Sequence, residues 1–315
     1  MNEQTISPEQ ERMFRDVKKG LTQEQKSLPS KYFYDERGSM LFDQITHQHE
    51  YYPTRCELSI MENNIAEIAA TLGAHIQLVE FGSGSSLKTR LLLQHLSQLS
   101  SYIPIDISRE YLMGTADKLK SEFPDLTIEP LAADYTKALE LPALKPSAKR
   151  RITYFPGSTI GNFNPGKARD FLQKNAAITR PNGGLLIGVD LKKDIKILEQ
   201  AYNDAEDVTA AFNLNILKHI NRVLEADFNL DQFEHHAYYN TTKGRVEMHL
   251  RSRCRQVVTI DDQPIEFYEG ETIHTENSYK YTLEEFSQLA EPWFTVEKVW
   301  TDENKYFSVQ FLKAI

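Results

Sequence analysis

The stretch LVEFGSGSSLKTR, residues 78–90, constrains the fold of this chain more than any other. Its apolar residues predict a short strand, and Gly82 and Gly84 predict a tight turn that opens a helix. In a parallel α/β sheet such a turn brings bare backbone against a nucleotide-like ligand, because glycine has no side chain to block it. A dinucleotide-binding motif would have a third glycine where this chain has Leu87. We therefore expect a ligand without a diphosphate.

Short apolar runs that alternate with helical stretches predict a parallel sheet built through crossover connections. The expected strands cover residues 76–80, 102–108, 126–131, 151–155 and 184–190. Residues 282–289 predict a helix, with Thr282 and Glu285 spaced as a capping box. Residues 294–300 and 306–312 predict a terminal antiparallel hairpin. Five parallel strands closed by such a hairpin are the pattern of the α/β, Rossmann-like core of class I methyltransferases.

The composition changes after Asp194, which indicates an inserted domain. Residues 197–224 are mostly helical in pattern, and residues 228–265 contain alternating stretches typical of antiparallel strands with one polar face. The chain has 315 residues, slightly more than one hydrophobic core of roughly 250 to 300 residues usually spans. One large domain or two unequal ones are the options that length allows.

Charge and cysteine content limit the partners. The formal net charge of −9 argues against nonspecific binding to nucleic acid or anionic membrane, since both need a positive field. Cys56 and Cys254 are far apart, so a CxxC redox motif or a cysteine-rich zinc site is not available. We expect no metal site, because the histidines, including His47, His49, His235 and His236, lack a ligand set with cysteines or carboxylates at fixed spacing. A polar start and the lack of a long apolar run predict a cytoplasmic protein, and the oligomeric state stays open, with a monomer among the options.

The predicted sheet edge favours S-adenosylmethionine over NAD. Asp106 ends the second predicted strand about 20 residues beyond the glycines, where an acid in this architecture meets ribose hydroxyls. Asp134, after the third strand, can accept a hydrogen bond from the exocyclic amine of adenine, or can act as a turn or N-cap residue. A pyridine-nucleotide enzyme would instead add another parallel crossover. The missing third glycine and the terminal hairpin therefore disfavour an NAD-dependent oxidoreductase.

Seven motifs in matching order resemble the histidine-specific methyltransferase family that makes hercynine for ergothioneine biosynthesis. They are KYFYD (31–35), GS (38–39), EYYPTR (50–55), EFGSG (80–84), KTR (88–90), GSTIGN (157–162) and TENS (275–278). The similarity runs from about Leu28 to the C-terminus. One hexapeptide can match by chance, but seven in register hardly can.

The resemblance implies a role for each matching position. It implies an S-adenosylmethionine-binding core of residues 61–195 and 282–315, and a discontinuous α+β substrate-binding domain of residues 1–60 and 196–281. Around the methyl donor it places Gly82, Ser83, Gly84, Lys88, Asp106, Asp134 and Tyr135. Around the amine and carboxylate of L-histidine it places Tyr51, Asn162 and Tyr202, with Tyr34 nearby as the catalytic residue. Around the imidazole it places Glu276, Ser278 and Met248.

These roles suit the chemistry of the side chains. Neutral donors such as Asn162 and a tyrosine hydroxyl can hold a carboxylate. Glu276 and Ser278 are two apart on a predicted strand and can point the same way toward the imidazole nitrogens. Each residue by itself also allows a plain structural role: a solvent-exposed strand position for Glu276, helix packing for Tyr202 and a turn for Asn162. The crowded tyrosines of residues 31–55 could likewise pack a surface subdomain.

The sequence therefore predicts an enzyme that trimethylates the α-amine of L-histidine. One alternative keeps the chemistry and changes the substrate to another amino acid or a histidine derivative, or adds fewer methyl groups. Another is a catalytically silent ligand-binding relative. The joint presence of Asn162, Tyr202, Glu276 and Ser278 argues against a silent protein, since binding alone does not need all four.

Overall fold

The computed structural model describes residues 7–83, 87–137 and 139–315, which belong to two compact units. One unit consists of Met1–Tyr51 and Asp194–Asn277, and the other of Tyr52–Lys193 and Ser278–Ile315. We call them the first unit and the second unit. The roles expected for the two parts of the chain, donor binding and substrate binding, remain predictions.

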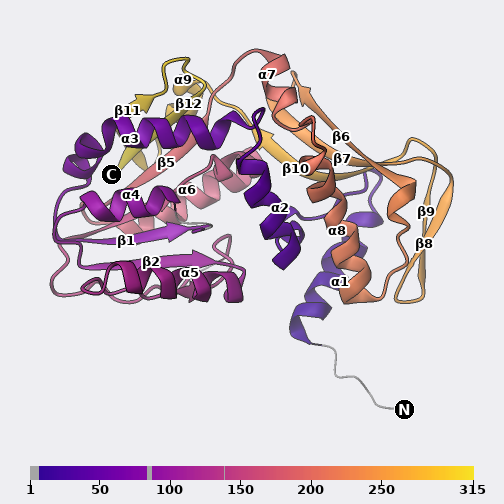
Figure 1. Ribbon diagram of the computed structural model, residues 1–315, viewed down its shortest axis with the longest axis horizontal. Coiled ribbons are helices and arrows are strands. Elements are labelled where there is room, and N and C mark those ends of the chain that lie inside the picture. The colour runs from indigo at the N-terminus through magenta and orange to yellow at the C-terminus, as the bar shows by residue number, and fades with distance from the viewer. Residues whose placement is uncertain (1–6, 84–86, 138) are drawn as a thin grey trace. The chain divides into compact units, whose positions relative to one another are not determined.

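The described residues of the second unit form a seven-stranded sheet of order β11-β12-β5-β4-β1-β2-β3 (Figure 1). Strands β1 to β5 pair in parallel, whereas β12 is antiparallel to both β5 and β11. The predicted five parallel strands and closing hairpin are thus confirmed. In chain order the elements are α3 (Tyr52–Leu72), β1 (Ile76–Phe81), α4 (Leu87–His95), β2 (Ser101–Asp106), α5 (Arg109–Glu122), β3 (Leu131–Ala132), β4 (Arg150–Phe155), the 3₁₀ helix η2 (Thr159–Asn162), α6 (Pro165–Thr179), β5 (Gly184–Asp190), α9 (Leu283–Ala290), β11 (Phe294–Thr301) and β12 (Phe307–Ala314).

Helices cover both faces of this sheet (Figure 1). Leu78 points into a core shared with α3, α4 and α5, and the next residue, Val79, points into a core shared with α6 and α9. This alternation follows from the period of two along a strand. It explains why β1 is buried along its whole length, since a parallel strand with helices on both sides has no face exposed to solvent.

Two sequence expectations need correction here. The third strand is not residues 126–131 but only Leu131–Ala132, with an isolated bridge from Ile128 to Tyr102. Pro130 explains the interruption, because proline has no N–H to donate to a ladder. The amphipathic pattern of residues 60–72 predicts a helix, and in the structure this helix begins earlier, at Tyr52. Pro53 is compatible with that start, since a first-turn position needs no N–H donor within the helix.

The first unit contains a three-stranded sheet of order β10-β7-β6 and a two-stranded β8-β9 sheet. Its antiparallel pairing of β6 with β7 confirms the strand type expected after the helical stretch. Helix α8 contributes buried Phe212, Ile216, Leu217 and Ile220. The elements are α1 (Pro8–Leu21), η1 (Ser30–Phe33), α2 (Glu36–Thr46), α7 (Ile195–Gln200), α8 (Val208–Leu224), η3 (Leu230–Gln232), β6 (Phe233–Asn240), β7 (Arg245–Ser252), β8 (Gln256–Ile260), β9 (Gln263–Phe267) and β10 (Thr272–Tyr279), whose end passes into the second unit.

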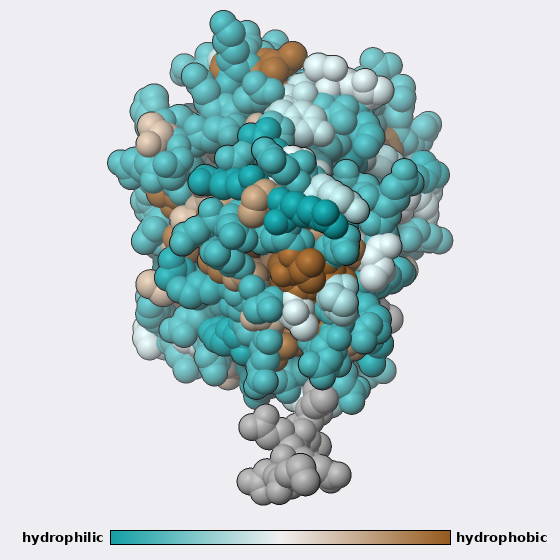
Figure 2. All heavy atoms as spheres, turned by 90° about the vertical axis from the view of Figure 1, so that its right-hand side faces the viewer, coloured by the Kyte–Doolittle hydropathy of each residue, from teal (hydrophilic) through white to brown (hydrophobic). Residues whose placement is uncertain are grey.

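On the face drawn in Figure 2, hydrophobic residues form small patches separated by hydrophilic ones. Such scattered apolar groups are normal for a protein surface. Among the described helices, none has the length and apolar character needed to span a bilayer.

The capping box of α9 is present and allows a stability test. Glu285 N–H donates to Thr282 Oγ1 at 3.1 Å, and Thr282 N–H donates to Glu285 Oε2 at 2.8 Å. Thr282→Ala removes the side-chain acceptor and is expected to lower the free energy of unfolding by about 1 kcal/mol. Thr282→Ser keeps the hydroxyl and is the matched control. Urea denaturation measures both, and an equal loss in the two variants would contradict the capping contribution.

Candidate active site

The glycine turn lies at the carboxyl end of β1. Gly82 has a φ of +70°, a left-handed conformation that favours glycine, and its N–H donates to the Ile105 carbonyl at 2.8 Å. Among the described residues other than its chain neighbours, no atom lies within 4 Å of where a Cβ would be, so the positive backbone angle is the reason for glycine here. Ser83 is buried. Gly84 lies outside the described residues.

Two neighbouring acids connect this turn to the rest of the sheet edge. Lys88, on α4, forms an ion pair with Glu57, whose carboxylate is fully buried and also accepts from the Gly157 N–H at 2.9 Å. Glu57 thereby joins α3, α4 and the loop after β4. The sequence reasoning missed it, although an acid on a helix face that carries Ile60 and Met61 was a usable signal.

Glu80 is the second acid, near the end of β1. Thr89 Oγ1 lies 2.8 Å from both of its carboxylate oxygens, and Tyr102 donates to the carboxylate as well. Burial raises the pKa of Glu80 to about 7, against the opposing effect of these hydrogen bonds. Thr89, in the predicted KTR motif, therefore serves to satisfy a buried carboxyl group.

The remaining donor-side residues lie at the same edge. Asp106 ends β2, and its Oδ1 accepts from the Ser108 N–H at 2.9 Å. Asp106 is in register with Ala132 of β3, so Asp134 follows two residues later. Asp134 Oδ1 accepts from the Thr136 N–H at 3.1 Å. This contact matches the turn role that the sequence allows for Asp134 besides an adenine contact. The Tyr135 ring contacts Phe81, with ring centroids 5.8 Å apart, next to the glycine turn.

The GSTIGN loop after β4 brings Gly161 against the backbone of β10. A Cβ on Gly161 would lie 2.8 Å from the Tyr279 carbonyl oxygen, so only glycine allows this approach. Ser158, at the other end of the loop, accepts from the Asp190 N–H at 2.9 Å. The second unit therefore brings Gly161, the neighbour of Asn162, against the backbone of Ser278 and Tyr279.

Asp190 is the centre of a buried charge cluster that the sequence reasoning did not identify. Its carboxylate accepts from Tyr52 at 2.8 Å, from Lys280 at 2.6 Å and from Lys193 at 2.5 Å. Lys280 also donates to Ser278 Oγ at 2.8 Å. We call Asp190, Tyr52, Lys193 and Lys280 the Asp190 cluster. Burial would raise the pKa of Asp190, but the two ammonium groups outweigh it and hold this pKa below its usual range; burial lowers the pKa of Lys193 to about 8.

In the first unit, three predicted tyrosines belong to one group of aromatic rings. Tyr51 packs edge-on against Tyr202, with ring centroids 6.4 Å apart. Phe42 contacts both Tyr51 at 6.4 Å and Tyr34 at 5.8 Å. Phe212 adds a further contact to Tyr34 at 5.7 Å. The structure thus brings Tyr34, Tyr51 and Tyr202 together, and it adds Phe42, which the sequence reasoning did not single out.

Met248 and Glu276 lie on neighbouring strands, β7 and β10. Thr275, next to Glu276, has its Oγ1 2.7 Å from Asn213 Oδ1 and 3.0 Å from the Met248 carbonyl oxygen, so its one O–H lies within reach of both acceptors. Met248 is buried. The hydroxyl of Thr275 therefore fixes the two strands relative to each other at the positions predicted to face the imidazole.

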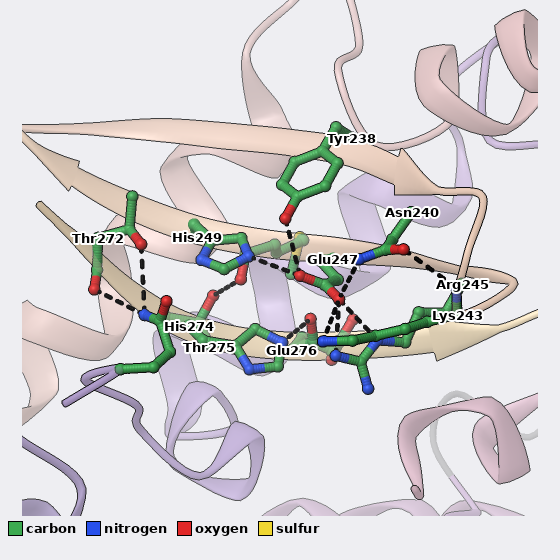
Figure 3. A network of polar contacts seen from close by, with 12 residues as sticks. Tyr238, Asn240, Lys243, Arg245, Glu247, His249, Thr272, His274, Thr275 and Glu276 are labelled. Atoms are coloured by element: carbon green, nitrogen blue, oxygen red, sulfur yellow. Dashed lines mark hydrogen bonds and ion pairs between the residues drawn. The ribbon is translucent and has the colours of Figure 1, made fainter. Parts of the chain in front are cut away.

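Figure 3 shows a polar network on the same sheet, centred on Glu247. Its carboxylate accepts from Arg245 at 2.6 Å and from Tyr238 at 2.9 Å, and lies 3.1 Å from His249 Nε2. The His249 ring stacks on His274, whose Nε2 lies 3.1 Å from the Glu276 carbonyl oxygen. Burial would raise the pKa of Glu247, but hydrogen bonds led by the one from Arg245 bring it to about 2. Next to Glu276, this network fixes the backbone of β10.

Ligand atoms of Glu247, His249 and His274 lie within 4.8 Å of one another, a composition that also occurs in metal sites. The sequence prediction that no histidine belongs to a metal-ligand set at fixed spacing includes these two histidines. Here the carboxylate already neutralises the Arg245 guanidinium, and the two rings stack at 26°. Nearly parallel rings do not aim their nitrogen lone pairs at a common point, so the geometry matches a hydrogen-bonded network better than a metal centre.

Comparison with known proteins identifies the family. The parallel sheet with its closing hairpin and the glycine turn form the α/β core expected for a class I methyltransferase. A family model described as histidine-specific, SAM-dependent methyltransferase matches residues 13–314. The chain belongs to this family, which confirms the predicted family, enzyme class and S-adenosylmethionine dependence.

Individual relatives extend the comparison. The histidine N-alpha-methyltransferase of Mycolicibacterium smegmatis is 44% identical over 298 residues, covering 93% of this chain and 92% of that one. The Mycobacterium tuberculosis protein of the same name is 43% identical over 296 residues, covering 92% and 91%. Ergothioneine biosynthesis protein 1 of Neurospora crassa is 31% identical over 305 residues, which covers 89% of this chain and 32% of that longer protein.

The stacked histidines predict a specific pH dependence of stability. Burial, followed by the neighbouring His249, lowers the pKa of His274 to about 4, whereas an unfolded histidine has a pKa of about 6.5. Between these values the unfolded chain takes up a proton that the folded protein excludes. Stability therefore falls as pH drops through this window, by about 2 kcal/mol at pH 5 from this residue.

His274→Gln removes the titrating ring while keeping an N–H donor for the Glu276 carbonyl. We expect its loss of stability between pH 7 and pH 5, measured by urea denaturation, to be about 2 kcal/mol smaller than that of the wild type. His47→Gln, at an exposed position, is the control and should behave as the wild type. Parallel losses in His274→Gln and the wild type would contradict the assignment.

Proposed function

We propose that this enzyme transfers methyl groups from S-adenosylmethionine to the α-amine of L-histidine three times, forming hercynine for ergothioneine biosynthesis. The observation that carries the proposal is the 44% identity, over 93% of the chain, to a protein named histidine N-alpha-methyltransferase. The relative in Neurospora crassa, named for ergothioneine biosynthesis, supports the pathway. We further propose a cytoplasmic enzyme that acts on a small amino acid without nucleic acid or membrane as partner.

For the methyl donor we propose the edge formed by the carboxyl ends of β1, β2 and β3. Gly82, Ser83, Gly84 and Lys88 would surround the amino acid part, Asp106 would accept from the ribose hydroxyls, and Asp134 with Tyr135 would contact the adenine. The observed geometry supports this assignment: among the described residues, Gly82 has open space at its Cβ position, and Asp106 ends a strand next to it in the sheet. The bound donor supplies an electrophilic methyl group on a sulfonium.

For histidine we propose that Tyr51, Asn162 and Tyr202 hold the amine and carboxylate, while Glu276, Ser278 and Met248 hold the imidazole. The contact between the Tyr51 and Tyr202 rings supports a joint role for these two residues. The close approach of Gly161 to the backbone of Ser278 and Tyr279 supports a position of the neighbouring Asn162 near the β10 end of the proposed site. A carboxylate and a hydroxyl together can satisfy both imidazole nitrogens, and a substrate with an apolar side chain would leave buried polar groups unpaired.

In methyl transfer the protein mainly positions groups and manages a proton. The amine lone pair must be held about 3 to 3.5 Å from the methyl carbon, in line with the bond that breaks. The ammonium form has no lone pair, so each methylation needs the loss of a proton. Tyr34 is our candidate for the route of that proton, because its ring belongs to the same aromatic group as Tyr51 and Tyr202.

The function is tested by incubating the purified protein with S-adenosylmethionine and each of a panel of amino acids, followed by mass spectrometry. We expect histidine to gain three methyl groups and the other amino acids to gain none at comparable enzyme concentration. Methylation of another amino acid with none on histidine would overturn the substrate assignment. A product that stops at one or two methyl groups would overturn only the trimethylation.

The imidazole contact predicts a selective loss in a Glu276 variant. Glu276→Ala is expected to raise the KM for histidine about 10- to 100-fold, since hydrogen bonds to charged groups contribute roughly 1.5 to 3 kcal/mol. Binding of S-adenosylmethionine, measured by calorimetry, should change little. Glu276→Gln keeps the shape without the charge and should be intermediate. Equal losses of donor and histidine binding would count against an imidazole contact.

Asp106→Ala provides the reciprocal test on the donor side. Loss of the carboxylate that is proposed to accept from the ribose should weaken S-adenosylmethionine binding about tenfold or more. Asp106→Asn retains an oxygen acceptor for the Ser108 N–H and controls for damage to that turn. Unchanged donor affinity in the alanine variant would contradict the ribose contact.

A further inference from the structure

Lys280 connects a buried charge cluster to one of the proposed substrate contacts. Its side chain is 1% exposed, and Nζ donates both to Asp190 Oδ2 at 2.6 Å and to Ser278 Oγ at 2.8 Å. A lysine ammonium has three donors and no acceptor. In this contact the serine oxygen must therefore be the acceptor, and its own hydrogen points elsewhere.

The partners of Asp190 fix the position of Lys280. Asp190 ends β5, its backbone N–H donates to Ser158 Oγ at 2.9 Å, and its carboxylate accepts from Tyr52 and Lys193. The carboxylate thus anchors one side of the ammonium group, and Ser278 occupies another. Because displacement of Nζ from this position would break charge-assisted hydrogen bonds in a buried site, the Lys280 to Ser278 contact is well defined.

We propose that Lys280 is a positioning residue for substrate selection: it makes the Ser278 hydroxyl a hydrogen-bond donor toward the unprotonated nitrogen of a neutral imidazole. This inference rests on the proposed function, in which Ser278 contacts the imidazole. Glu276 would accept from the N–H of the same ring. A neutral imidazole offers one donor and one acceptor nitrogen, so Glu276 and Ser278 together can hydrogen-bond to both nitrogens. An imidazolium has no acceptor nitrogen for the Ser278 hydroxyl, and an apolar ring has no partner for either residue.

Lys193 offers a matched control within the same cluster. Its side chain is 3% exposed, it donates to Asp190 as Lys280 does, and it also donates to the Tyr52 hydroxyl. Replacing either lysine removes one positive charge and leaves Asp190 with one ammonium partner. The two variants therefore perturb the charge balance equally, but only the change at Lys280 removes the donor to Ser278.

The test compares Lys280→Met, Ser278→Ala, the double variant and Lys193→Met in steady-state kinetics with histidine, in S-adenosylmethionine binding and in thermal melting. Lys280→Met and Ser278→Ala are each expected to raise the KM for histidine about tenfold, as for one lost hydrogen bond. The double variant should show no more than either single change, because Lys280 acts through Ser278. Lys193→Met should lower the melting temperature as Lys280→Met does while leaving this KM near the wild-type value.

Lys280→Gln adds a rescue experiment, since its amide N–H can still donate to Ser278. It should recover most of the histidine KM lost in Lys280→Met, and it replaces that variant if the methionine prevents folding. Additive losses in the double variant, or an equal KM increase in Lys193→Met, would overturn the proposal. A wild-type KM in Ser278→Ala would overturn it together with the imidazole role of Ser278, and failure of the wild type to methylate histidine would refute the proposed function itself.

Discussion

Parallel pairing of β1 to β5 is the constraint on which the rest of the second unit depends. Parallel strands place all of their carboxyl ends at one edge of the sheet, so loops far apart in sequence meet there. The Gly82 turn, Asp106, Asp134, the GSTIGN loop and Asp190 each end or follow one of these strands. The parallel direction of the strands is therefore what brings the residues of the candidate site to one edge of the sheet.

Buried acids hold that edge together. Glu57, Glu80 and Asp190 are each at most 1% exposed, and an unpaired buried charge is costly. Each has partners from a different segment: Lys88 and the Gly157 N–H for Glu57, Thr89 and Tyr102 for Glu80, and Tyr52 with two lysines for Asp190. Breaking any of these contacts would leave a buried carboxylate unpaired, so the three acids hold the segments at this edge in fixed positions.

Much of the fold followed from the sequence because it depends on local patterns. The apolar runs, the glycine turn, the α9 capping box and the terminal hairpin all depend on residues close in sequence, and all were predicted. The third strand was wrong because Pro130 interrupts the ladder, and the start of α3 was set too late. Glu57 and Lys280 were missed because their partners Lys88 and Asp190 lie 31 and 90 residues away in the sequence.

The sequence by itself determined the fold class, the enzyme family and the residue types available for donor and acceptor, because these depend on spacing and motif order along the chain. Only the tertiary structure decided which of those residues lie close together. It gathered Tyr34, Tyr51 and Tyr202 into one aromatic group and placed Gly161, the neighbour of Asn162, against the β10 backbone. It also gave Ser278 a buried ammonium partner. Hydrogen-bond polarity depends on distances between atoms, and spacing along a chain does not specify those distances.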